Sequence, residues 1–460
     1  MSGINLFINT IKHFAEISTN KIMIVDHDGQ RKNTYNEFWN CVIKIGNEIR
    51  KRQKTTDSHF IPIVLSDIME YIASTIAIWA TGNTAVYLGV YFPKERINYI
   101  ASETKAPFII DEDFVDNASV LEPLKIVPRN EKDACAMFYT SGSTGHPKGV
   151  LHSDEGFNCG IFRYFEFYRQ QDCKSFFSMS PYNFVAIVFT YAMIANGAEV
   201  HSVGNNIKND VNLIEKYFLE HNIECAFLTP SILRVINIKS PFLKYIITGG
   251  ENIAGYKSGD FNLLSTYGQT ETVCAITSTL YHHNTDCISL GVPAKDIEIQ
   301  LVDEEGNTIP DGDSGELVIT KGLVPPVYFN DSEGTKELMR GGVFHTGDIM
   351  RKLPNGDLVY VQRKDWMVKI NGQRVEPGEI ETVLRKLSGI KDAIVKGFTK
   401  EDLSRQYLVA YYIPQEGKIE EDTIRKYLTE KLPPYMVPSF FVEMKEFPRN
   451  ANGKLDRKSL

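Results

Sequence analysis

Residues 1 to about 240 alternate two hydrophobic patterns, one typical of helices and one typical of buried strands. In "TYNEFWNCVIKIGNEIRKR" (34–52), the apolar residues Phe38, Val42, Ile45 and Ile49 recur every three or four positions, which predicts an amphipathic helix. The short apolar runs "FIPIVL" and "APFIID" are predicted to be buried strands instead. Because strands that alternate with helices usually pair in parallel, we expect a parallel sheet with covering helices.

From about residue 286 to residue 361 the pattern changes to short strands separated by turn signals. The apolar runs are "IEIQLVD", "GELVIT" and "LVYVQ", and the turn signals are "EEGN" and "PNGD". Such a series is typical of antiparallel, hairpin-rich architecture.

A second change falls near "QRKDWMVK", where the density of charged residues rises. The last strongly patterned helix is predicted at "EEDTIRKYLTEKL", with Ile424, Tyr427 and Leu428 on one side. We therefore predict a large domain over 1–361, a hinge over 362–366 and a small α+β domain over 367–460.

Composition excludes several classes of protein. The chain has 460 residues, of which 43% are hydrophobic and 23% charged, as in ordinary globular proteins of two or three domains. Its net charge of −8 argues against a nucleic-acid-binding protein, whose binding surface would be basic. Seven scattered cysteines without a CxxC pair suggest neither a zinc site nor a disulfide framework. We find no signal peptide and no apolar run of about 20 residues, so we expect a cytoplasmic enzyme without a membrane span.

The stretch "YTSGSTGHPKGV" (139–150) is the first candidate for chemistry. It follows the predicted strand "ACAMFY" and precedes a helix that Ser153 is expected to cap. Glycines let backbone N–H groups approach an anion, hydroxyl groups add donors, and Lys148 adds positive charge, as the outer phosphates of a nucleotide require. A solvated linker has the same composition. A P-loop, GxxxxGK[ST], does not fit, because Lys148 follows Pro147 and precedes Gly149.

This stretch closely resembles the phosphate-loop signature of the adenylate-forming superfamily, which comprises acyl-CoA synthetases, luciferases and the adenylation domains of nonribosomal peptide synthesis. Further stretches resemble the remaining motifs of that family, in the family's order. They are "TYNEF" (34–38), "GNTAVYLGVYFPKERINYI" (82–100), "STYGQTE" (265–271), "GELVI" (315–319), "FHTGDI" (344–349), "QRKDWMVKINGQRVEPGEIE" (362–381), "LPPYMVP" (432–438) and "NGKLDR" (452–457).

The pattern and the resemblance together imply an α/β fold. The large N-terminal domain is expected to hold packed mixed sheets with helices plus a small β-barrel-like part, and the small α+β C-terminal domain is expected to be mobile. The implied reaction joins a carboxylate to the α-phosphorus of ATP, gives an acyl-adenylate and pyrophosphate, and then passes the acyl group to a thiol.

The resemblance also implies the residues that bind ATP and Mg²⁺. Lys454 would bridge the substrate carboxylate and the α-phosphate, where positive charge is needed, and Glu271 would help to hold Mg²⁺. Asp348 would accept hydrogen bonds from the ribose, assisted by Arg363. The loop residues that would steady the β- and γ-phosphates are Thr140, Ser141, Gly142, Ser143, Thr144, Gly145 and Lys148, of which Thr144 and Lys148 are also assigned to catalysis with Lys454. The adenine pocket and the phosphate contacts beside it would be formed by Gly249, Gly250, Glu251, Thr266, Tyr267, Gly268, Gln269 and Thr270.

Asp365 corresponds to the family's hinge residue, about which the small domain would swing between adenylation and thiol transfer. The family usually has Gly-Arg before it, whereas this chain has Gln362-Arg363, which puts the hinge's behaviour in question. After the swing, Lys369 to Gly372 would face the active site.

The acid pocket is assigned from the same resemblance. Its predicted wall is Asn183, Phe184, Val185, Val188, Phe227, Ile247, Gly249, Thr266, Cys274 and Ala275. Members that activate α-amino acids place an aspartate near Asn183 or Phe184 to pair with the ammonium, and this chain has none there. A buried ammonium without a carboxylate is costly, so an aryl or other apolar carboxylic acid is favoured, with a D-alanine-type amino acid as the alternative.

The acceptor is either a phosphopantetheinylated carrier protein supplied in trans, which "LPPYMVP" and "NGKLDR" favour, or coenzyme A. A nucleotide-binding homologue without activity would be expected to have lost Lys454, Glu271 or Asp348. All three residues are present.

Overall fold

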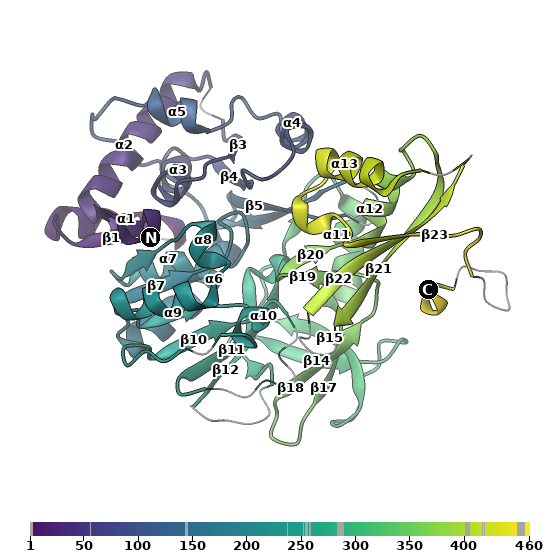
Figure 1. Cartoon of the computed structure of the whole chain (residues 1–460). Helices are drawn as coiled ribbons and strands as arrows, with labels where there is room; N and C mark the ends of the chain where they lie inside the picture. The colour runs from purple at the N-terminus through teal and green to yellow at the C-terminus, as the bar shows by residue number, and fades with distance from the viewer. Residues whose placement is uncertain are drawn as a thin grey trace. The chain divides into compact units, whose positions relative to one another are not determined.

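The computed structural model describes most of the chain (Figure 1). The described residues are 3–55, 57–142, 146–236, 238–251, 253, 256, 259–282, 289–400, 405–415, 417, 419–448 and 456–460. They divide into two compact units. The first comprises Met1–Val90, Ala101–Phe138 and Gly149–Gln362, and the second comprises Tyr91–Ile100, Tyr139–Lys148 and Arg363–Leu460. The domain bounds and the hinge given above stay predictions.

A nine-stranded sheet is the largest element of the first unit, and its strand order is β13-β12-β11-β10-β9-β7-β8-β1-β2. The neighbours from β11 to β1 pair in parallel, whereas β12, β13 and β2 are antiparallel additions at the two ends. The bounds are β1 (Ile22–Asp26), β2 (Arg31–Thr34), β7 (Ser175–Ser178), β8 (Glu199–His201), β9 (Cys225–Phe227), β10 (Tyr245–Thr248), β11 (Asn262–Gln269), β12 (Cys274–Tyr281) and β13 (Val292–Pro293). This confirms the predicted sheet.

Both faces of this sheet are buried, each against its own hydrophobic core. Because successive side chains along a strand point to opposite faces, β7, β9 and β10 each contribute residues to both cores. On β7, Phe176 belongs to one core and Phe177 to the other, and Phe177 meets Phe218 of helix α9 with ring centroids 4.9 Å apart. Burial on both faces is typical of parallel sheets, and Figure 1 shows α7 and α9 beside β7.

Two further sheets complete the first unit. A five-stranded sheet has the order β16-β6-β5-β4-β3, and a four-stranded sheet has the order β14-β15-β17-β18. The latter is the predicted hairpin-rich part, with β14 antiparallel to β15 and β15 antiparallel to β17. The bounds are β3 (Phe60–Ile63), β4 (Thr84–Tyr87), β5 (Ala134–Thr140), β6 (Lys148–Ser153), β14 (Glu298–Val302), β15 (Ser314–Lys321), β16 (Val327–Tyr328), β17 (Phe344–Lys352) and β18 (Leu358–Arg363).

The helices of this part of the chain follow the predicted periodicity. All four apolar residues predicted to face the core on α2 are buried, and Thr34 begins the helix with a capping box that pairs it with Glu37. Ser153 caps α6 as predicted, and its side chain accepts from Gly156 N–H at 3.2 Å. The bounds are α1 (Gly3–Ile17), α2 (Tyr35–Arg52), α3 (Ile68–Ala80), α4 (Lys94–Glu103), α5 (Glu112–Asp116), α6 (Asp154–Gln171), α7 (Ile187–Ala195), α8 (Asn205–Lys208), α9 (Val211–Glu220), α10 (Pro230–Leu233) and α11 (Ser332–Leu338).

The C-terminal part of the second unit is α+β. The three-stranded sheet β21-β22-β23 packs its core side against α12 and α13. Of the three residues predicted to share one side of α13, Ile424 and Leu428 are fully buried and Tyr427 is half-buried. The bounds are β19 (Val368–Ile370), β20 (Gln373–Val375), β21 (Ile390–Lys400), β22 (Arg405–Pro414), β23 (Phe440–Glu443), α12 (Pro377–Leu384) and α13 (Glu421–Lys431).

One predicted strand is wrong. The run "APFIID" forms only a single bridge, between Ile110 and Ile63 of β3, with Ile110 N–H donating to the carbonyl of Pro62 at 2.9 Å. Pro107 has no N–H for a continuous ladder, which is consistent with this reduced pairing. Across the part of the chain that the structure describes, none of the helices combines the length and hydrophobicity that a membrane span needs.

A buried ion pair fixes the start of α6 and yields a test of the fold. Asp154 is 0% exposed in its side chain and Arg129 1%, and Asp154 also accepts from Ile4 N–H at 3.1 Å. We expect Asp154→Ala to lower the free energy of unfolding by about 3–5 kcal/mol, because the buried guanidinium loses its counter-charge. Thermal unfolding measures the effect. Glu333→Ala, which removes the partner of Lys336 in a pair that is 83% and 72% exposed, is the control and should cost at most about 1 kcal/mol. Equal midpoints for the two variants would contradict the prediction.

Candidate active site

The predicted site residues of the first unit gather where the parallel strands β7, β9, β10 and β11 end. The register aligns Ser178 with Phe227, Phe227 with Ile247, and Thr248 with Ser265. The carboxyl ends of β7, β9 and β10 therefore lie side by side, and β11 passes them at Ser265 and continues to Gln269. Ligands in open α/β sheets bind outside such an edge, so the fold itself marks this edge as the candidate site.

The predicted acid pocket lies on one face of this edge. Phe227 and Ile247 point into the same core as Val188 of α7 and Ala275 of β12, and Phe227 stacks on Phe189 with centroids 4.9 Å apart. These side chains are largely buried. Cys274 lies on β12, but its side chain is outside the described residues.

Asn183, Phe184 and Val185 lie on the connection between β7 and α7. Phe184 N–H donates to the carbonyl of Pro181 at 3.1 Å, and Val188 N–H donates to that of Val185 at 3.1 Å, so the connection is a tight double turn. Asn183 is only 6% exposed. The structure thus places the amide-bearing residue Asn183 in a buried position on the connection that leads into α7.

The predicted nucleotide residue Tyr267 lies on the opposite face of the same edge. Because Thr266 and Tyr267 are consecutive on β11, their side chains point to opposite faces, and Tyr267 packs in the other core. Its hydroxyl donates to Oδ2 of Asp348, an almost fully buried residue of β17. Gln269 Nε2 donates to the same oxygen at 2.7 Å and to the carbonyl of Thr346 at 2.8 Å. Tyr267, Gln269 and Asp348 therefore form one hydrogen-bonded group.

The turn after β10 brings the backbone close to β11. A Cβ on Gly249 would lie 2.5 Å from Oγ1 and 2.6 Å from the carbonyl oxygen of Thr266, so only glycine fits there without displacement. Gly250 has a φ of 83°, which also favours glycine. Glu251 accepts from Ser231 N–H at 2.9 Å and from its hydroxyl, which holds the turn against α10. Thr266 Oγ1 donates to the carbonyl of Thr248 at 2.9 Å.

Glu271 lies on the 3-10 turn η2 (Thr270–Thr272), which joins β11 to β12 after Gly268 and Gln269. It is 1% exposed, and its Oε1 accepts from the hydroxyl of Tyr328 at 2.8 Å. His152 of β6 lies near this carboxylate. Burial lowers the pKa of His152 to about 4, against the opposite effects of the Glu271 charge and of a hydrogen bond with the backbone of Thr270.

These residues fit a Mg²⁺ ion. Mg²⁺ takes hard oxygen ligands, and in nucleotide enzymes it is held by one or two carboxylates, phosphates and several waters. Glu271 offers a buried carboxylate, and His152 Nε2 is a buried polar atom without a hydrogen-bond partner among the described residues, as a site for ordered water requires. When bound, the cation would offset the charge of the phosphates.

A different acidic group is satisfied by a guanidinium. Ligand atoms of Asp26, His27 and Asp67 all lie within 4.8 Å of one another, but Arg31 forms ion pairs with both aspartates. Since Arg31 already balances their charge, we do not assign a metal to this group.

The predicted phosphate loop belongs to the second unit. A Cβ on Gly142 would lie 2.0 Å from the carbonyl oxygen of His146, so only glycine fits at position 142 without displacement. Gly142 N–H donates to Oε2 of Glu379 at 3.0 Å, and Ser141 Oγ accepts from Glu376 N–H at 2.9 Å. The loop amide therefore binds an anionic oxygen. Thr140 and Lys148 end β5 and begin β6, while Ser143, Thr144 and Gly145 lie outside the described residues.

Arg363 and Asp365 form a bidentate ion pair, with Nε–Oδ1 and Nη2–Oδ2 distances of 2.9 and 2.6 Å. Burial raises the pKa of Asp365, but the hydrogen bonds and charge of Arg363 outweigh it and hold that pKa below its usual range. Asn371 and Gly372 turn the hairpin between β19 and β20 with φ values of 50° and 77°, as a two-residue type I′ turn requires. Lys454 lies outside the described residues.

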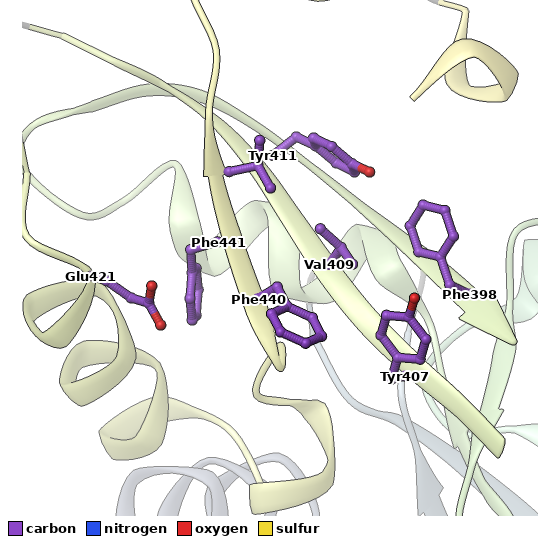
Figure 2. A pocket seen from close by; sticks show the side chains of 8 residues that line it. Phe398, Tyr407, Val409, Tyr411, Glu421, Phe440 and Phe441 are labelled. Atoms are coloured by element: carbon purple, nitrogen blue, oxygen red, sulfur yellow. The ribbon is translucent and has the colours of Figure 1, made fainter. Parts of the chain in front are cut away.

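The second unit also carries a shallow hollow of about 400 Å³ on the exposed face of its three-stranded sheet (Figure 2). Cross-strand pairing aligns Phe398 with Tyr407 and Val409 with Phe440, so aromatic side chains gather on that face. The lining residues are Phe398, Tyr407, Val409, Tyr411, Glu421, Phe440, Phe441 and Val442. They include none of the predicted site residues, so the hollow is not the predicted acid or nucleotide site.

Sequence reasoning missed two residues next to Glu271. Tyr328 and His152 belong to no motif, and only the pairing of β16 with β6 brings Tyr328 to this place. A weak signal for His152 was available. The alternation along "VLHS" places a histidine at a position where the strand pattern predicts a buried apolar residue.

Two family models match this chain, each over a different part. The model described as AMP-binding enzyme matches residues 11–329, and the model of the AMP-binding enzyme C-terminal domain matches residues 379–454. The chain belongs to the AMP-binding enzyme family. Its reaction class is therefore that of an adenylate-forming ligase, which uses ATP to activate an acid.

Named AMP-binding relatives differ greatly in length. Tyrocidine synthase 3 of Brevibacillus parabrevis is 29% identical over 94% of this chain, but the match covers only 7% of that synthase. The D-alanine–D-alanyl carrier protein ligase of Bacillus licheniformis is 27% identical, with 98% of both chains covered. The structure of a double-mutant o-succinylbenzoate CoA synthetase of Bacillus subtilis aligns with a TM-score of 0.84 over 98% of both chains at 19% identity, which shows the shared fold.

The hydrogen-bonded group around Asp348 yields a prediction for ATP binding by this AMP-binding enzyme. We expect Tyr267→Phe to raise the KM for ATP roughly tenfold with little change in kcat, because a hydrogen bond to a charged group contributes about 1.5–3 kcal/mol. Pyrophosphate exchange at varied ATP concentration measures both constants. Tyr256→Phe, which changes another tyrosine that packs against the same core, is the control and should leave the KM unchanged. An unchanged KM in Tyr267→Phe would contradict the role of this group.

Proposed function

We propose that this AMP-binding enzyme activates an aryl or other apolar carboxylic acid and transfers it to a carrier protein. The carboxylate oxygen of the acid attacks the α-phosphorus of ATP and pyrophosphate leaves. The thiolate of a phosphopantetheine arm then attacks the acyl carbon, and AMP leaves. Neither the adenylation step nor the transfer step requires a further reactant.

The register at the strand edge is the observation that supports the proposal best. Thr266 lies on the face of the predicted acid pocket, and Tyr267, hydrogen-bonded to Asp348, lies on the other. An acid and a nucleotide held on these two faces can meet beyond the carboxyl ends of the strands, where the two faces join. That proximity is what an adenylation reaction needs, because it converts a bimolecular step into an oriented one.

The chemistry of the pocket supports the class of acid. Phe227, Ile247, Val188 and Ala275 are apolar and buried, and the buried polar members of the predicted pocket, Asn183 and Thr266, are both neutral. A substrate ammonium buried among these side chains would lack a counter-charge. An amide can instead hydrogen-bond a ring hydroxyl or a similar neutral group.

A D-alanine-type amino acid is the alternative substrate, and coenzyme A is the alternative acceptor. The relative that matches this chain over nearly its full length supports the first alternative, because its name specifies D-alanine and a D-alanyl carrier protein. The second is supported by the shared fold of the CoA synthetase. We favour the carrier protein because the full-length relative, at 27% identity, is the more closely related by sequence.

We assign Mg²⁺ to Glu271 and the α-phosphate contact to Lys454. Both assignments come from the resemblance of "YGQTE" and "NGKLDR" to the family motifs. The buried setting of Glu271 supports the first, since a buried carboxylate gains most from a cation.

Lys454→Ala tests the catalytic assignment. We expect the rate of ATP–pyrophosphate exchange to fall by roughly 10²–10³, the usual effect of losing one group that stabilises developing charge. Lys445→Ala, which removes an exposed lysine of the same unit, should leave the rate unchanged. An unchanged exchange rate in Lys454→Ala would contradict the catalytic role assigned to Lys454.

Substrate-dependent exchange across aryl, fatty and amino acids tests the class of acid. We expect aryl or apolar acids to support exchange in the wild type. Asn183→Asp should reduce that exchange at least tenfold, because a carboxylate buried among apolar groups is costly. Activity with α-amino acids alone would refute the pocket assignment. Transfer of the labelled acyl group to a phosphopantetheinylated carrier protein, and not to coenzyme A, is the expected outcome for the acceptor.

A further inference from the structure

Gln269 ends β11 and holds three partners with one side chain. Its Nε2 donates to Oδ2 of Asp348 at 2.7 Å and to the carbonyl of Thr346 at 2.8 Å, both on β17. Its side-chain carbonyl accepts from Thr272 N–H and so caps the turn η2. These partners fix which end of the amide is nitrogen, because carboxylates and carbonyls only accept and an N–H only donates. Gln269 therefore links β17 to the turn that follows β11.

The nitrogen of this amide is used inside the protein. A primary amide has two hydrogens, and these face the acceptors on Asp348 and Thr346. A longer contact of 3.4 Å reaches the hydroxyl of Tyr267, which itself donates to Asp348. Any effect of the Gln269 nitrogen on a bound nucleotide therefore passes through Asp348.

Asp348 is held relative to the backbone of its own strand. Thr346 and Asp348 are two residues apart on β17, and the Gln269 amide binds the carbonyl of one and the carboxylate of the other. Asp348 N–H also donates to Oγ1 of Thr346 at 3.1 Å. Asp348 is 1% exposed, and a buried carboxylate needs such donors. The orientation of the carboxylate is therefore set by protein contacts before a ligand binds, as preorganised binding sites require.

We propose that Gln269 is a positioning residue that orients the Asp348 carboxylate for the ribose hydroxyls of ATP. This inference rests on the ribose role assigned to Asp348. The same side chain caps the turn that carries Glu271, the carboxylate to which we assign Mg²⁺. One glutamine therefore ties together the two acidic residues that we assign to the nucleotide and its cation.

The test compares the binding of ATP with that of 2′,3′-dideoxy-ATP, which has the same base and phosphates but lacks both ribose hydroxyls. Equilibrium dialysis with Mg²⁺ and without a carboxylic acid gives a Kd for each nucleotide. The ratio of the two Kd values isolates the contribution of the ribose hydroxyls. We expect the wild type to bind ATP at least about tenfold more tightly, because hydrogen bonds to a carboxylate are charge-assisted.

Gln269→Leu removes the donor and the cap at similar side-chain volume. It should lower the ratio about fivefold, the usual effect of losing one hydrogen bond, because Asp348 loses a group that orients it. Gln300→Leu changes an exposed glutamine of β14 in the same unit and should leave the ratio unchanged. A glutamine that only stabilises the turn would alter both Kd values by the same factor. Equal ratios in the wild type and Gln269→Leu would overturn the inference.

Asp348→Ala distinguishes the failure of this inference from that of the ribose assignment. If Asp348→Ala lowers the ratio and Gln269→Leu does not, only the inference about Gln269 is wrong. If Asp348→Ala keeps the wild-type ratio, the ribose assignment and the inference are both wrong. Pyrophosphate exchange by the wild type with a cognate acid reports separately on adenylate formation.

The double variant tests whether Gln269 acts through Asp348. In the Asp348→Ala background, Gln269→Leu should cause no further change in the ratio, because residues that act through one contact are not additive. A further fivefold fall in the double variant would contradict that route.

Gln269→Glu keeps the inference testable if Gln269→Leu disrupts the turn. Gln269 is half-buried, and glutamate keeps its length and an oxygen for the Thr272 cap. The donor is replaced by a second carboxylate oxygen beside Asp348, and like charges at this distance repel. The ratio should therefore fall by more than in Gln269→Leu. A wild-type ratio in Gln269→Glu would overturn the inference.

Discussion

The alternation of side chains along β9, β10 and β11 is the constraint on which the candidate site depends. Each strand is buried on both faces, and each places consecutive residues in different cores, as in Ile246 and Ile247. A change of register by one residue would exchange the two cores and would bury the wrong residues. The same alternation places Thr266 on the face of the predicted acid pocket and Tyr267 on the opposite face.

The turns that follow these strands are held by contacts from elsewhere in the first unit. Asp348 comes from the four-stranded sheet and accepts from Tyr267, while Tyr328 comes from the five-stranded sheet and donates to Glu271. Buried carboxylates require such partners, because an isolated charge in a core is costly. Three sheets are therefore linked at one edge by the hydrogen bonds of two acidic residues.

The sequence predicted those features that depend on local order. The period of Phe38, Val42 and Ile45 predicts α2 correctly, and the motif order predicts the family. The strand at "APFIID" is wrong because a short apolar run does not reveal whether its backbone finds a partner strand. Tyr328 was missed for the related reason that β16 is only two residues long, so its pairing with β6 leaves almost no periodic signal.

The contact between Gly142 and Glu379 adds a constraint to the proposed function. Gly142 N–H is fully used by the carboxylate at 3.0 Å, and Glu379 is also paired with Arg96 at 2.6 Å. One amide hydrogen makes one strong hydrogen bond, so a phosphate oxygen and the carboxylate compete for it. If the loop steadies the outer phosphates of ATP, as we propose, then ATP binding and this contact exclude each other. In the structure this amide donates to the carboxylate of Glu379.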